Sequence, residues 1–391
     1  MSLTIERYGG NESEWDKFML DESMNGTFLQ TRKFINYHAK GKFKDCSLCI
    51  RKGQELMAAV LACEVDDDGT KTFFAHKGTT FGGITISRKI YTASLIDELF
   101  TLLDDFLKSE NFGKVYLKLV PVVFQRENTD MIDYFLYKYG YMCRGELNCY
   151  ITLSNYGDDI ALQFSTNNRR NYRYSLNKGL AFRELNEHKD ISSFYEVLQK
   201  NLKKFNALSV HSLDELYDLK YNRFNDRIKF YGVYLGEKLV AGSMVFLFGN
   251  DIYHTQYLAS DKDYLKLFPM DFLIANLILT AIHDNMRLLT LGICTEDQGR
   301  YLNFGLSRFK EGFGATFCVN RSYEKLQEIS VEQPMTEPEL IAKMRTANSE
   351  QRTALILFSK FTDINLSLMI YVIQGKYFFM LWGAGNVRKN F

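Results

Sequence analysis

The sequence predicts a mixed α/β fold built from two similar halves in tandem, followed by a C-terminal β-meander. Two observations support this prediction. The same order of strand-like and helix-like segments occurs twice, and the end of the chain repeats only the strand-like part. We place the halves at residues 1–155 and 156–327, a linker at 328–352 and the meander at 353–391.

Each half contains three β-rich runs separated by turn signals. In the first half the runs lie within residues 46–78, and in the second half within residues 228–260. The turns are Asp-Asp-Asp-Gly in the first half, and Gly-Glu and Gly-Asn-Asp in the second. These residues tolerate the backbone angles of tight hairpins. We therefore expect an antiparallel meander in each half.

An amphipathic helix and a further strand follow each meander. In the first half, apolar residues at helical spacing predict a helix near residues 92–111, which ends before Gly113 and precedes VYLKLV. In the second half, Pro269 suits the first turn of a helix that continues through Ile282 and precedes LLTLGIC. A mixed sheet with helices on both faces accommodates this order.

The repeat closes with a second helix and a last strand. The segment from Phe135 to Gly140 precedes MCRGELNCYITL, and the segment from Phe309 to Gly314 precedes TFCVNRSYEKL. We expect Phe309 to superpose on Phe135 and Gly314 on Gly140. The alternative is a chance likeness between two α/β segments, and the shared order of about six elements argues against it.

The tail has a different composition. Residues 328–352 are polar and contain Pro334 and Pro338, which predicts a linker. Residues 353–391 contain three apolar runs and begin either a partial third repeat or a hairpin that covers a sheet edge. Because an exposed apolar sheet is unfavourable, we expect the tail to be covered, and it could also join two chains in a homodimer.

Charge and cysteine content exclude some classes of protein. The 48 basic and 47 acidic side chains give a net charge of +1, so any contact with nucleic acid requires a local basic patch. The 7 cysteines do not suggest a disulfide framework, and Cys46 and Cys49 would face opposite sides of a strand. We expect no metal site. The N-terminus is unlike a signal peptide and no long apolar run occurs, so the sequence predicts a cytoplasmic protein.

Three stretches resemble the Fem-type transferases, duplicated GNAT-like proteins that build peptidoglycan cross-bridges. They are Phe28-Leu29-Gln30, the basic segment 165–179 and the segment GLSRFKEGFG at 305–314. The resemblance covers about residues 1–327 and is one of family only. It implies transfer of an acyl or aminoacyl group to an amine of a cell-envelope sugar or peptide precursor. It also implies an acyl-CoA or aminoacyl-tRNA donor, with no tightly bound cofactor.

The sequence departs from the GNAT pattern at the usual pyrophosphate loop. Residues 261–269, which precede the helix at Pro269, contain no glycine, so backbone N–H groups cannot approach a phosphate as closely there. Lys262 and Lys266 could still contact phosphates of a donor. The departure weakens ordinary CoA use, while the neutral charge balance weakens tRNA binding, and both donors remain open. A non-catalytic protein that binds a nucleotide-sugar or polysaccharide precursor is the alternative function, and an RNA-binding module is a third.

Lys310 is the first candidate catalytic residue. The resemblance implies that this lysine stabilises negative charge near the carbonyl or ester of the donor. The matching position in the first half is Leu136, so the fold itself does not require lysine there. We therefore expect the chemistry in the second half and a catalytically degenerate first half. A solvated surface lysine is the alternative.

Three further residues are candidates for catalysis. Glu296 and Asp297 follow the strand LLTLGIC and could orient or deprotonate the acceptor amine, although a turn also favours such residues. His254 lies in the strand IYHTQYLAS, which flanks the acyl group in the GNAT fold, and His76 has a similar place in the first half. A buried structural histidine is the alternative for both.

The remaining candidates would bind substrate. Arg169, Arg170, Arg173 and Lys178 form a basic cluster on one predicted helix, which could hold a diphosphate or a tRNA backbone. A solvated helix face is the alternative. The resemblance adds Gln30 to the substrate-binding residues.

Overall fold

The computed structural model describes residues 2–203, 209–249 and 251–327, together with three strands in the tail. The chain divides into two compact units, Met1–Glu328 and Ile329–Phe391. Within the described residues, none of the helices combines the length and the apolar character needed to cross a bilayer.

The first half combines a small sheet with helices. The small sheet has the order β1-β3-β4-β7, with β1 (Leu3–Arg7), β3 (Leu48–Lys52), β4 (Glu55–Leu61) and β7 (Gly83–Ile86). Its helices are α1 (Glu12–Lys17), α2 (Arg32–Ile35), α3 (Ala93–Ser109) and α4 (Asp130–Lys138). The predicted helix at 92–111 is α3, and its apolar stripe is buried in the core with Phe73 and Phe112.

A second, large sheet extends through both halves. Its strand order is β10-β11-β12-β13-β14-β9-β17-β8-β6-β5-β2. The strands are β2 (Lys44–Asp45), β5 (Cys63–Asp67), β6 (Thr70–Phe74), β8 (Lys114–Lys118), β9 (Met142–Thr152), β10 (Leu180–Glu184), β11 (Ile228–Leu235), β12 (Lys238–Phe248), β13 (Ile252–Ser260), β14 (Leu288–Ile293) and β17 (Thr316–Leu326). The expected mixed sheet is confirmed, because β6 pairs with β8 and β13 with β14 in parallel while the other pairs are antiparallel.

Helices cover both faces of the sheet in the second half. They are α5 (Thr166–Ser175), α6 (His188–Lys203), α7 (Leu213–Tyr217), α8 (Pro269–His283) and α9 (Phe304–Glu311). Successive residues of β11 belong to different cores: Phe230 packs with Phe194 of α6, and Tyr231 packs with residues of α8. Because neighbouring side chains of a strand point to opposite faces, α6 and α8 lie on opposite sides of the sheet.

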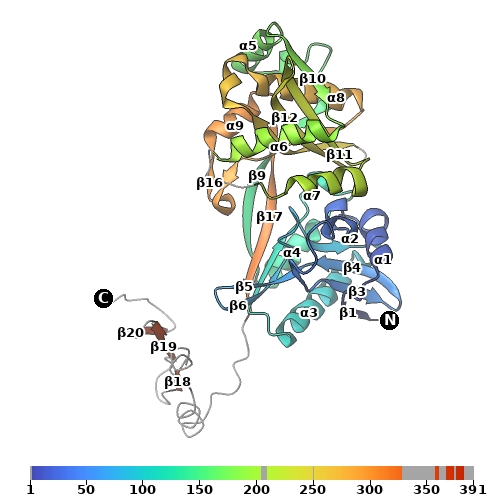
Figure 1. Cartoon of the computed structure of the whole chain (residues 1–391). Helices are drawn as coiled ribbons and strands as arrows, with labels where there is room; N and C mark the ends of the chain where they lie inside the picture. The colour runs from blue at the N-terminus through green and yellow to red at the C-terminus, as the bar shows by residue number, and fades with distance from the viewer. Residues whose placement is uncertain are drawn as a thin grey trace. The chain divides into compact units, whose positions relative to one another are not determined.

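The halves exchange their last strands. β9, the last strand of the first half, pairs with β14 of the second half, while β17, the last strand of the second half, pairs with β8 of the first. The two exchanged strands run antiparallel to each other at the middle of the sheet, as Figure 1 shows. This exchange explains why both halves belong to a single compact unit, and the domain boundary at 155/156 stays a prediction.

The register of the exchanged strands has two-fold character. Met142 pairs with Glu324 and Tyr150 pairs with Thr316, so the first residue of each strand meets the ninth of the other. Phe135 in α4 and Phe309 in α9 precede these strands by the same number of residues, and Gly140 and Gly314 have φ of 80° and 83°. The residues expected to superpose thus occupy corresponding elements.

The tail forms an antiparallel meander in the part that the structure describes. Its strands are β18 (Leu357–Lys360), β19 (Ser367–Ile373) and β20 (Lys376–Trp382), paired in this order. The predicted C-terminal β-meander is confirmed. The predicted linker, residues 328–352, lies outside the described residues. Whether the tail covers a sheet or joins two chains stays a prediction.

Candidate active site

The parallel strands β13 and β14 separate part of the way along their length. They pair at Ile252 with Leu288, at Tyr253 with Leu289 and at His254 with Thr290. Beyond this point β13 continues to Ser260 and β14 to Ile293 without pairing with each other. We call the region between the diverging strands the splay. It lies at the carboxyl ends of two parallel strands, where α/β sheets commonly bind ligands.

A β-bulge lies in each strand that borders the splay. The register between β12 and β13 shifts after Met244, which leaves Gln256 as the extra residue. The register between β14 and β9 shifts between Thr290 and Gly292. Gly292 has φ of 74°, in the left-handed region that favours glycine. Bulges are common beside active sites because they turn single side chains out of the regular pattern.

Lys310 lies against the bulge of β14. Its side chain extends from α9 and is only 4% exposed. The ammonium Nζ donates hydrogen bonds to the carbonyls of Gly292 at 3.0 Å and Ile293 at 2.8 Å. Burial lowers the pKa of Lys310, and the Cys294 thiol beside it partly offsets this effect. The alternative of a solvated surface lysine is therefore wrong.

Two buried thiols lie near the ammonium of Lys310. The Sγ atoms of Cys149 in β9 and Cys294, just after β14, are 2.8 Å apart and both residues are buried. Burial raises the pKa of the Cys149 thiol, so it stays protonated at neutral pH. The Lys310 ammonium thus has two hydrogen-bond acceptors, the carbonyls of Gly292 and Ile293, and the Cys294 thiol lies near it.

His254 lies where β13 leaves β14. Its Nδ1 shares a hydrogen bond with the hydroxyl of Thr290. Burial, followed by the charge of Lys310, lowers the pKa of His254 to about 4. The imidazole is therefore neutral at pH 7. In the first half the strand register puts Phe74 at this place, so the predicted correspondence with His76 is wrong by two residues.

The two candidate carboxylates lie outside this cluster. Glu296 and Asp297 are exposed and belong to the hairpin of β15 (Thr295–Glu296) and β16 (Tyr301–Leu302). Glu296 accepts a hydrogen bond from Asn303 at 2.8 Å, and Asp297 lies 3.7 Å from Arg300. Asp297 and the next residue, Gln298, have φ of 46° and 54°. Such left-handed residues store strain and are common at functional sites.

The start of α8 differs from a phosphate-binding helix N-terminus. A short 3₁₀ helix (Lys262–Leu267) precedes it, and Pro269 offers no N–H group. Asp271 in the first turn is buried, accepts a hydrogen bond from Asn171 at 3.4 Å and has its pKa raised to about 6 by burial. Lys262 and Lys266 remain exposed beside it. A buried acidic side chain in the first turn disfavours a diphosphate at this helix start.

The basic cluster divides into one structural and three outward-facing side chains. Arg169 donates hydrogen bonds to the carbonyls of Ala161, Leu162 and Phe164 at 2.8–3.0 Å. The guanidinium of Arg169 is therefore occupied by hydrogen bonds to backbone carbonyls of its own chain. The other three lie on or near the surface: Arg170 bonds Asn167, Arg173 lies 3.5 Å from Asp159, and Lys178 lies over the Tyr174 ring.

The end of the basic helix adjoins the start of α8. The rings of Tyr174 and Phe268 are 5.6 Å apart, which brings α5 next to the segment that carries Lys262 and Lys266. Gln30, by contrast, is fully buried in the first half. It accepts from the Thr27 N–H and donates to Thr85 and the carbonyl of Gly82. Its amide groups are therefore occupied.

The structure adds residues that sequence reasoning missed. Thr290 and Gly292 shape the splay, and the glycine inside an otherwise apolar strand was a signal for a bulge. His211, between α6 and α7, lines a pocket between the halves. No sequence pattern around it indicated a site.

Comparison with known proteins identifies the fold. Residues 166–311 match the acetyltransferase (GNAT) domain family. The structure is similar to that of FemX, with a TM-score of 0.59, 13% identity and coverage of 82% of this chain and 97% of FemX. A search of curated proteins finds no match to the sequence.

Two other solved structures have a related fold. L-PGS from Bacillus licheniformis has a TM-score of 0.53 and 11% identity, with coverage of 81% of this chain and 92% of that chain. A tandem GNAT protein from the clavulanic acid biosynthesis pathway has a TM-score of 0.50 and 10% identity, with coverage of 83% and 98%. The expected GNAT-superfamily fold, with its resemblance to Fem-type proteins, is confirmed.

Proposed function

We propose that this chain, whose second half carries a GNAT-type acetyltransferase domain, transfers an acyl or aminoacyl group to an amine. The observation that supports the proposal most directly is the splay between β13 and β14, with a buried lysine and a neutral histidine at its base. Peptide groups on the facing edges of separated strands can pair with an extended ligand. The acyl carbonyl of the donor would lie there.

The reaction requires no covalent enzyme intermediate. The nitrogen lone pair of a neutral amine attacks the donor carbonyl carbon, forming a C–N bond and an oxyanion. The oxyanion then collapses as the C–S bond of a thioester, or the C–O bond of an aminoacyl ester, breaks. The leaving sulfur or oxygen takes up the proton that the amine loses. The protein must bind both reactants and stabilise the transient negative charge.

Lys310 would act through its charge and through the geometry it fixes. Its N–H groups bond the carbonyls of Gly292 and Ile293, so the ammonium holds the bulge of β14 in place. A cation in a poorly solvated site also stabilises a nearby oxyanion without a direct hydrogen bond. His254, whose pKa is about 4, is a weak base. We assign it the positioning of Thr290, with which it shares a hydrogen bond. We assign the exposed Glu296 and Asp297 the orientation of the amine.

The donor would be held from outside the splay. GNAT domains typically use acyl-CoA, but here Asp271 disfavours a diphosphate at the start of α8. A CoA donor would therefore depend on Lys262, Lys266 and the exposed residues of the basic helix. The same residues suit the phosphates of an aminoacyl-tRNA. The proposed acceptor is an amine on a cell-envelope sugar or peptide precursor, and the proposed location is the cytoplasm.

Product detection tests the function. The full chain is incubated with acetyl-CoA or aminoacyl-tRNA and with glucosamine or a lysine-containing peptide as acceptor. Mass spectrometry of the acceptor should show the added acyl or aminoacyl mass with one donor. If no donor modifies either acceptor above the rate without protein, the proposal of catalysis fails for these acceptor classes.

A non-catalytic binding protein is the second candidate. Two observations favour it: Lys310 donates to two carbonyls of its own chain, and the buried Asp271 lies in the first turn of α8, where it disfavours a diphosphate. A thermal-shift titration separates the two functions. Stabilisation by coenzyme A supports a thioester donor, whereas stabilisation by a nucleotide-sugar alone supports the binding protein.

A further inference from the structure

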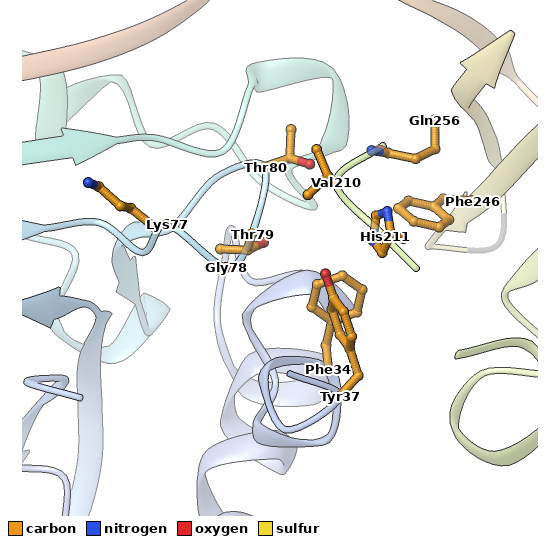
Figure 2. A pocket seen from close by; sticks show the side chains of 10 residues that line it. All are labelled: Phe34, Tyr37, Lys77, Gly78, Thr79, Thr80, Val210, His211, Phe246 and Gln256. Carbon is orange, nitrogen blue, oxygen red and sulfur yellow. The ribbon is translucent and has the colours of Figure 1, made fainter. Parts of the chain in front are cut away.

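A pocket lies between the two halves, beside the proposed active site. Its cavity volume is about 210 Å³. The first half contributes the aromatic residues Phe34 and Tyr37 and the loop 77–80, and the second half contributes His211, Phe246 and Gln256, as Figure 2 shows. A water molecule occupies about 30 Å³ in the liquid, so the cavity has room for one small ring rather than for a polymer.

His211 presents an unused hydrogen-bonding atom in this pocket. The residue is only 4% exposed, and its Nε2 has no hydrogen-bond partner within the described residues. A buried polar nitrogen without a partner costs about 1–3 kcal/mol, so such an atom usually marks a ligand or water position.

The contacts of His211 leave Nε2 available in either tautomer. Its Nδ1 lies 2.7 Å from the hydroxyl of Tyr257. The Ser209 hydroxyl donates to the His211 carbonyl at 2.7 Å and the His211 N–H donates to Ser209 Oγ, so neither proton is directed at Tyr257. The phenol can therefore donate to Nδ1 or accept from it. In both cases Nε2 keeps one hydrogen-bonding direction, as an N–H donor or as an acceptor, and a hydroxyl group can satisfy either.

The walls of the pocket are aromatic and nearly uncharged. Lys77 is the one charged side chain among the lining residues that the structure describes, and its ammonium lies 5.5 Å from the Phe74 ring. His38 also stays neutral near pH 7, because burial lowers its pKa. Thr79, Thr80 and Gln256 add neutral hydrogen-bonding groups. A ligand with a phosphate or a zwitterionic peptide end would find no matching set of charges here.

Gln256 connects the pocket with the splay. It is the bulged residue of β13, it follows His254 by two residues and it lines the pocket. A group bound in the pocket therefore lies next to the place where the acyl carbonyl would be held. That position suits the acceptor, whose amine must reach the carbonyl carbon.

We propose that this pocket binds an uncharged sugar ring of the acceptor, with His211 Nε2 hydrogen-bonded to one of its hydroxyl groups. The proposal rests on the function proposed above and selects a sugar over a peptide. Aromatic faces with neutral donors and acceptors match a ring that is apolar on its faces and polar at its edges. Phe34, Tyr37 and Phe246 would contact the ring faces, while Thr80 and Gln256 would bond its edge.

Ligand-observed NMR on the full chain without any donor tests the proposal. The probes are methyl N-acetyl-β-D-glucosaminide, the dipeptide Ala-Ala and inorganic phosphate, each at millimolar concentration. We expect saturation transfer to the glycoside alone. The variant His211→Leu with Tyr257→Phe removes both members of the internal hydrogen bond, so folding should be little affected. It should weaken glycoside binding about tenfold, the loss of roughly one hydrogen bond.

Two controls separate a binding role from a structural one. His211→Gln retains an N–H donor near the position of Nε2 and should retain most of the binding. Val210→Ala changes a largely exposed residue at the pocket and should bind as the parent does. Binding of Ala-Ala or phosphate in place of the glycoside, no binding of any probe, or unchanged binding by the double variant would each overturn the proposal. Acyl transfer to a non-sugar amine together with any of these results would leave the proposed function standing.

Discussion

The two halves share a fold but differ at the same three positions around their parallel strand pairs. Where the second half has His254 hydrogen-bonded to Thr290, the register of β6 and β8 in the first half puts Phe74 and Tyr116, whose rings stack 4.6 Å apart. Where the second half has the buried Lys310, the first has Leu136, which is also buried. The fold is thus satisfied by two aromatic side chains and a leucine at these three places.

The pairing of the strands around these positions also differs between the two halves. β8 pairs with β17 without a register shift, and so does β5 with β6, whereas both corresponding pairs in the second half contain a bulge beside the splay. Buried polar groups and bulges reduce stability compared with regular apolar packing. At these corresponding positions only the second half has them, which supports the proposal that the chemistry takes place there. The residues of the first half therefore show what the fold alone requires at the corresponding positions of the second half.

The largest expected effect follows from removing the charge of Lys310. Lys310→Met should lower turnover about a hundredfold, because a cation near an oxyanion in a poorly solvated site is worth roughly 3 kcal/mol of activation free energy. The melting temperature should also fall, since the carbonyls of Gly292 and Ile293 lose their donor. Steady-state kinetics and thermal unfolding measure the two effects.

Leu136→Met is the matched control in the first half. It replaces a buried apolar residue by one of similar volume, so it should cost less than about 1.5 kcal/mol and leave turnover unchanged. Full activity of Lys310→Met, or an equal loss of activity in Leu136→Met, would remove the distinction between the halves.

The next largest expected effect is a pH dependence of the free energy of unfolding, which arises from the protonation of His254. Its pKa is about 4 in the folded protein and near 6.5 when unfolded, so the unfolded chain binds the proton first. The stabilisation that the neutral His254 gives the folded protein is complete above pH 6.5. As the pH falls toward 4, this contribution to the free energy of unfolding is lost, a decrease of about 3 kcal/mol.

His254→Phe copies the residue of the first half, Phe74, and tests this assignment. His76 and His211, whose pKa values burial also lowers to about 4, keep their contributions in the variant. The loss of unfolding free energy on acidification, measured by urea denaturation, should therefore be smaller in the variant than in the parent. Identical pH dependence in both proteins would show that His254 is not neutral and buried in solution.

A smaller effect is expected from the bulge in β14. Gly292 has φ of 74°, and a Cβ at this position would meet no other atom within 4 Å. Gly292→Ala should therefore cost about 1–2 kcal/mol through backbone strain alone. If the bulge positions the acyl carbonyl, turnover falls as well. Normal stability would mean that the left-handed bulge does not form, and normal turnover with reduced stability would separate the bulge from catalysis.

The smallest effect concerns the basic helix. The exposed Arg170 and Arg173 can be changed to Ala together with no more than about 0.5 kcal/mol of lost stability. Arg169→Ala should cost more, because it donates to three carbonyls. In the first half the first helix, α1, has acidic residues in its first turn, in contrast to the basic α5. If a phosphate-bearing donor binds here, the double variant raises its KM and flattens the salt dependence.

Much of this architecture follows from the sequence. The helix start at Pro269, the stripe of α3, the turn signals and the positive-φ glycines after α4 and α9 are local features, which depend on neighbouring residues and are therefore readable along the chain. The opposite faces of Cys46 and Cys49 were predicted in the same way and are confirmed, because the two side chains lie in different cores.

Other features depend on contacts between distant segments. The exchange of β9 and β17 leaves no trace in the pattern of either strand, since an antiparallel neighbour from either half satisfies the same backbone groups. Whether Lys310 was a surface residue or a buried one was decided by the carbonyls of β14, which are distant in sequence. The pairing of His254 with Thr290 and the orphaned nitrogen of His211 likewise exist only where separate strands and loops meet. The sequence alone therefore determined the elements and their repetition, and the tertiary structure decided which polar side chains are buried together, because burial and pairing are properties of assembled contacts.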